Sequence, residues 1–89
     1  MTVEVSKFNG LVKVSHFEEL DTVETLRTLC ENIFITNPDV AQLEETEQAN
    51  GDFVFTLRNA KGRVINRYQT LTVLDKMSID IADDHKPIS

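Results

Sequence analysis

Asn9-Gly10 stands between two valine-bearing runs, and this dipeptide constrains the fold more than any other feature of the chain. Asn and Gly tolerate the positive φ angles that a type I′ turn needs at both central residues, so the pair predicts a tight β-hairpin. Valines alternate with polar residues over positions 2–8 and 11–16, which puts the valines of each strand on one face. The sequence therefore predicts a ribbon whose apolar face needs a cover.

An amphipathic helix is expected to supply that cover. Asp21 can accept hydrogen bonds from first-turn amides, and Glu24 three residues later resembles a capping box in which Asp replaces Ser or Thr. Pro38 ends the helix, because proline disfavours helical geometry in the residue before it. Between these limits, apolar residues at spacings of three and four predict one buried stripe: Val23, Leu26, Leu29, Cys30, Ile33 and Phe34.

The second half of the chain reads as a loop followed by two strands. Residues 39–52 are acidic and without period, which predicts a loop with room for a short strand or helical turn. Apolar residues alternate again from Phe53, and Gly62 suits the left-handed position of a bulged hairpin. We expect one core between sheet and helix: Val5, Val14, Val23, Leu26, Cys30, Ile33, Phe55, Leu57, Leu71 and Val73.

Length, charge and cysteine usage bound the class of protein. A chain of 89 residues is normally one domain, which we place at residues 1–76 with a flexible tail at 77–89. Eleven acidic and three basic side chains fall in residues 1–52, whereas residues 53–69 hold four basic side chains and no acid. The net charge of −6 disfavours direct nucleic-acid binding. No apolar run is long enough for a membrane, and the single cysteine suits the cytoplasm.

The order of these motifs resembles ubiquitin and its relatives of the β-grasp fold. The Gly10 turn stands where that family has its first hairpin turn, "DTVETLRTLC" is similar to its first helix, and "QTLTVLD" is similar to its last strand. The resemblance implies an α+β domain with a mixed four- to five-stranded sheet packed on one helix, in the order ββαββ. Conjugated members end in Gly-Gly, whereas this sequence ends in Pro-Ile-Ser, so the resemblance implies a non-conjugating member.

Two functions remain open at this point. The first is a non-catalytic ubiquitin-like module that binds a protein partner. The second is a small acidic inhibitor of phage or mobile-element origin that mimics nucleic acid and blocks a nucleic-acid-binding enzyme. The acidic residues that suggest the second function are Glu18, Glu19, Asp21, Glu24, Glu31, Glu44, Glu45 and Glu47.

The candidate partner-binding residues lie near the two hairpin turns. Phe8 and Leu11 flank the first turn, where Phe8 either stands exposed at the tip or lies across the sheet. Arg63, Arg67 and Tyr68 form a second candidate surface, because guanidinium groups and an aromatic ring are frequent anchors at interfaces.

No pattern of catalytic or metal-binding residues emerges from the sequence. His16 and His85 have no ligand partner at metal-binding spacing, and no Gly-x-Ser-x-Gly or phosphate-binding glycine motif occurs. Cys30 falls on the apolar stripe of the helix, where burial would leave the thiol inert. We expect no enzyme activity, no metal and no cofactor.

Overall fold

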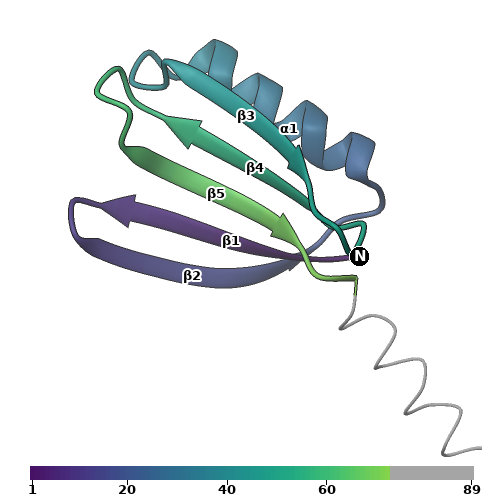
Figure 1. Cartoon of the computed structure of the whole chain (residues 1–89). Coiled ribbons are helices and arrows are strands. Elements are labelled where there is room, and N and C mark those ends of the chain that lie inside the picture. The colour runs from purple at the N-terminus through teal and green to yellow at the C-terminus, as the bar shows by residue number, and fades with distance from the viewer. Residues whose placement is uncertain (73–89) are drawn as a thin grey trace, which may run out of the picture.

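One helix packs against an antiparallel sheet of five strands in the computed structural model, which describes residues 1–72 (Figure 1). The elements follow in the order β1 (Thr2–Asn9), β2 (Val12–Glu19), α1 (Val23–Thr36), β3 (Gln42–Glu47), β4 (Phe53–Arg58) and β5 (Val64–Thr70). Their order in the sheet is β2-β1-β5-β4-β3. The α+β class is as expected from the sequence.

The sheet differs from the expected one in two ways. All four strand pairs among residues 1–72 are antiparallel, so the expected mixed sheet is wrong for this part of the chain. The order is ββαβββ and not ββαββ, because residues 42–47 form an edge strand where the sequence predicts a loop. The glutamates of β3 obscured its alternation, yet Leu43 packs against the core while Glu44 lies on the opposite face.

The first turn differs in type from the one expected. Asn9 pairs with Val12, so the two central residues are Gly10 and Leu11. Gly10 has a φ of +64°, and no residue other than glycine has a positive φ in the described chain. A single positive φ at the first central position is the pattern of a type II′ turn, which also matches the twist of the strands. The hairpin is therefore confirmed, but glycine alone supplies its unusual conformation.

The helix begins one residue later than the sequence suggests. Thr22, and not Asp21, is the N-cap, and its Oγ1 accepts a hydrogen bond from the Thr25 amide at 3.2 Å. Asn37 closes the other end with its amide donating to the Ile33 carbonyl at 2.9 Å, so the stop before Pro38 is confirmed.

The helix lies over β3 and β4 and leaves β2 uncovered (Figure 1). Arg27 donates hydrogen bonds to both carboxylate oxygens of Glu45 on β3, at 2.6 and 3.0 Å, and also pairs with Glu24. Because α1 does not cover β2, every residue of β2 is exposed. The expected cover of the hairpin is therefore confirmed for β1, whose Val3 and Val5 are buried in one cluster with Leu26, and wrong for β2.

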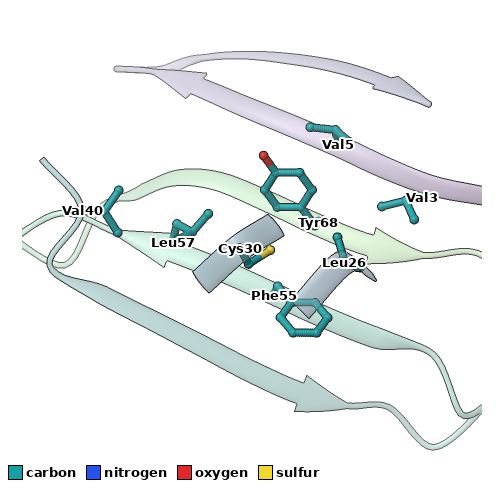
Figure 2. Close-up of a cluster of buried hydrophobic side chains, with 8 residues drawn as sticks. All are labelled: Val3, Val5, Leu26, Cys30, Val40, Phe55, Leu57 and Tyr68. Atoms are coloured by element: carbon teal, nitrogen blue, oxygen red, sulfur yellow. The ribbon is translucent and has the colours of Figure 1, made fainter. Parts of the chain in front are cut away.

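The core forms where α1 meets β1, β4 and β5 (Figure 2). Leu26, Cys30 and Leu57 are fully buried, as expected, and Val23 and Ile33 pack at the edge of the same cluster. The buried members of the cluster are Val3, Val5, Leu26, Cys30, Val40, Phe55, Leu57 and Tyr68.

Several residues expected in the core lie elsewhere. Val14 is 62% exposed because it belongs to β2, which the helix does not reach, and Phe34 is 39% exposed at the rim of the helix stripe. Leu71 is partly buried outside the main cluster. Val73 and the boundary expected at residues 76 and 77 fall outside the described residues.

Candidate protein-interaction site

The turn between β1 and β2 (residues 10–11) and the turn between β4 and β5 (residues 59–63) lie at the same end of the sheet (Figure 1). Between them is an open cavity of about 620 Å³, lined by Phe8, Gly10, Leu11, Arg63 and Val64. Three of the five residues proposed from the sequence therefore meet in one site, although Leu11 and Arg63 are 52 positions apart in the sequence. Antiparallel pairing of β1 with β5 produces this meeting.

The first turn presents two apolar side chains in different ways. Phe8 faces away from α1, because it stands three residues from the core residue Val5 on the same strand. It is partly exposed and pairs across the ribbon with Lys13. Leu11 is 105% exposed, since the second central position of a tight turn points its side chain into solvent. Phe8 therefore forms the wall of the cavity and Leu11 its outer lip.

The second turn holds Arg63 in place through Asn59. The Asn59 side-chain oxygen accepts hydrogen bonds from the amides of Lys61 and Arg63, at 3.0 and 2.9 Å. Gly62 has a φ of +81°, and the ladder has a bulge beside Leu57, so the bulged turn expected from the sequence is confirmed. These hydrogen bonds hold the backbone of Arg63 in place, so the turn determines where its side chain begins.

Arg63 carries the positive charge of the site. Two other arginines form ion pairs: Arg27 with Glu45 and Glu24, and Arg58 with Glu44 at 3.0 Å. Arg63 has no carboxylate partner within residues 1–72. The site thus combines apolar walls with a guanidinium group that can pair with an incoming carboxylate.

The remaining two candidates do not line this cavity. Arg67 is partly buried on β5, where it pairs in register with Ser6 and Thr56 on the face opposite α1. Tyr68 follows it on the other face and is 5% exposed among the core side chains (Figure 2). Burial also raises the pKa of Tyr68. Adjacent strand residues point to opposite faces, so the expected Arg67–Tyr68 surface does not form.

Val64 and Gly10 are the lining residues that the sequence reasoning missed. Val64 precedes the bulge and pairs with Arg58, so its side chain lies on the same face as Phe8. A bulge shifts the alternation of a strand by one residue, and the position of the bulge could not be read from the sequence. Gly10 lines the cavity with backbone, which no side-chain pattern reveals.

The other chemically active side chains are not grouped into a site. Burial raises the pKa of the Cys30 thiol to about 12, with smaller contributions from Glu31 and Glu45. His16 lies 2.8 Å from Glu18 on exposed β2. No group of three or more His, Cys, Asp or Glu side chains in residues 1–72 is placed to hold a metal ion.

The fold and the cavity together define a small α+β domain with an apolar site that carries one arginine. Comparison of the chain with protein-family models, with curated proteins and with solved structures found no match. No helix in the described part of the chain is long and apolar enough to cross a membrane.

Proposed function

We propose that this domain is a non-catalytic protein-interaction module, and that its partner binds in the cavity between the two turns. The observation that carries the proposal is the meeting of Phe8 and Leu11 with an Arg63 that has no carboxylate partner in residues 1–72. Exposed apolar surface beside an arginine is typical of the residues that contribute most to binding at protein interfaces.

The chemistry of the cavity favours a particular kind of partner. An apolar side chain of the partner would contact Phe8 and Leu11, and an adjacent carboxylate would pair with Arg63. Arginine suits this role because its planar group can bind a carboxylate through two hydrogen bonds. The partner segment is therefore expected to combine one large apolar residue with a neighbouring acid.

The interaction function does not depend on the mixed sheet of the β-grasp fold. A ubiquitin-like identity and a cytoplasmic location are part of the proposal. The ordered motifs and the single cysteine support them, whereas the all-antiparallel pairing in residues 1–72 counts against the ubiquitin-like identity. The cavity itself requires only that β1 and β5 lie side by side.

The acidic residues give less support to nucleic-acid mimicry. A mimic needs carboxylates available to a basic groove, yet Glu44 pairs with Arg58 and Glu45 pairs with Arg27. These two arginines neutralise part of the row of charge on β3. We therefore do not propose the inhibitor function.

Peptide selection against the full chain tests the proposal. Peptides enriched from a displayed random library should carry an apolar residue next to Asp or Glu. Phe8→Ala with Leu11→Ala should weaken their binding by about 2 kcal/mol, a roughly 30-fold rise in Kd by calorimetry. Arg63→Glu should weaken it similarly, and a peptide with the acid changed to Lys should restore part of that loss.

A matched control separates this site from other apolar surface. Ile35 is 77% exposed on α1, so Ile35→Ala should leave both binding and melting temperature unchanged. Binding that ignores the turn variants but disappears on Glu24→Lys with Glu31→Lys would refute the proposal and favour the acidic mimic.

A further inference from the structure

We infer that β2 is a dimerisation edge, where a second copy of this chain pairs antiparallel with it and extends the sheet across a two-fold axis. This surface is separate from the cavity between the turns. β2 lies at the end of the sheet, and no strand within residues 1–72 pairs with its outer side.

The backbone of β2 is oriented for such pairing. The Leu20 amide donates to the Met1 carbonyl at 2.9 Å, which continues the register of β1 and β2. Antiparallel ladders alternate between bonded and non-bonded pairs, so the amides and carbonyls of Lys13, Ser15 and Phe17 point away from β1. A long edge strand with these groups available is a template for another strand.

The side chains of β2 favour association over solvation. Val12, Val14 and Phe17 are each at least 61% exposed, and they lie on both faces of the strand. The opposite edge of the sheet is different, because β3 carries three glutamates in six residues. Pairing two copies through β3 would bring these acids together, and Arg27 and Arg58 neutralise only Glu45 and Glu44, so the remaining repulsion opposes association. The two edges thus differ in a way that selects β2.

A second copy is the occupant that the sequence of β2 fits. A two-fold axis at Ser15 keeps both helices on one face of the extended sheet. It places Lys13 of each copy opposite Phe17 of the other copy. The ammonium group can then lie against the aromatic ring. Glu19 of the second copy, whose carboxylate also pairs with its own Met1 amino group at 3.2 Å, is the diagonal neighbour of Lys13, so opposite charges also lie near each other. An axis at His16 would instead place two imidazoles against each other.

Charge exchange across the interface tests both the dimer and its register. Equilibrium sedimentation of the full chain should show a monomer–dimer equilibrium. Phe17→Lys would set two lysines opposite each other and should raise the dimer Kd about tenfold or more. Adding Lys13→Glu to that variant should restore the dimer, because each lysine then faces a carboxylate. Circular dichroism checks that each variant is folded.

Cysteine cross-linking gives an independent measurement. Cα atoms of directly opposed bonded residues are about 5.5 Å apart, which a disulfide can span. Ser15→Cys should therefore oxidise to a covalent dimer much faster than Thr46→Cys, the matched exposed control on β3.

A chain that stays monomeric at about 300 µM, a dimer that tolerates Phe17→Lys, or equal cross-linking at both edges would overturn the inference. A peptide strand or the segment 73–89 bound at β2 would appear as a monomer and count against it.

Discussion

The Thr72 amide and hydroxyl both donate hydrogen bonds to the Oδ1 atom of Asp52, at 3.1 and 2.6 Å. Asp52 is 2% exposed at the end of the turn before β4, whereas Thr72 follows β5. Thr70 and Asn50 donate to the same carboxylate at 3.0 and 3.1 Å. One side chain therefore ties the start of β4 to the end of β5.

This carboxylate should make stability depend on pH. Burial would raise the pKa of Asp52, but the hydrogen bonds from Thr72, Thr70 and Asn50 outweigh it and hold that pKa below its usual range. Because the folded pKa is the lower one, the contribution is complete above the unfolded value of about 3.9 and is lost as pH falls through the folded pKa.

Asp52→Asn should therefore lower the free energy of unfolding by about 1–3 kcal/mol at pH 7. The difference from the parent chain should shrink as the pH falls below about 4 in urea melts. Glu47→Gln, on exposed β3, serves as the control. A difference that stays constant down to pH 2 would contradict the assignment.

The buried face of α1 is tested by a pair of apolar truncations. Leu26 is fully buried and Ile35 is 77% exposed on the same helix. Leu26→Ala should cost about 2–5 kcal/mol of unfolding free energy, because it leaves a cavity in the core. Ile35→Ala should cost less than about 0.5 kcal/mol. Equal costs in denaturant melts would mean that the helix packs through another face.

The type II′ turn predicts different tolerances at two neighbouring residues. Gly10 has a positive φ, and a side chain there meets no other atom within 4 Å, so the penalty for Gly10→Ala comes from the backbone alone. We expect a loss of about 1–2 kcal/mol in thermal or urea unfolding. Asn9→Thr should be tolerated, since Asn9 is an ordinary strand residue here. A costly Asn9→Thr would instead indicate the type I′ turn.

The Cys30 thiol should be unreactive in the folded protein. Its pKa of about 12 leaves almost no thiolate near neutral pH, and burial blocks access as well. A chromogenic disulfide reagent at pH 8 should react only after urea unfolds the chain. Rapid labelling in the absence of denaturant would show that the helix opens locally.

The local elements were largely predictable because their signals lie within a few neighbouring residues. Asn9 and Gly10 predicted the hairpin, the spacing from Val23 to Ile33 predicted the helix, and Gly62 predicted the bulged turn. Even here the exact residues shifted by one, since Thr22 caps the helix and Gly10 alone has the positive φ. Local chemistry predicts reliably that a turn or a cap is present. It predicts less reliably which residue forms it.

The candidate site was predictable only in part. Phe8 and Leu11 were proposed because they flank a turn, and Arg63 because it is basic near another turn. Their meeting depends on β1 pairing with β5, which no local pattern encodes. Tyr68 was misplaced for a related reason: adjacent residues on a strand face opposite sides, and only the register shows which side holds the core.

By itself, the sequence determined that this chain has a hairpin, an amphipathic helix and further strands, because periodicity and turn chemistry are local properties. Only the tertiary structure decided which side of each strand is buried and which strands lie at the edges. The glutamates of residues 42–47 suggested a loop, yet arginines from α1 and β4 pair with two of them and allow an edge strand. Val14 was expected in the core but is exposed, because α1 packs over β3 and β4 and does not reach β2. Burial depends on what packs above a residue, and that partner is distant in the chain.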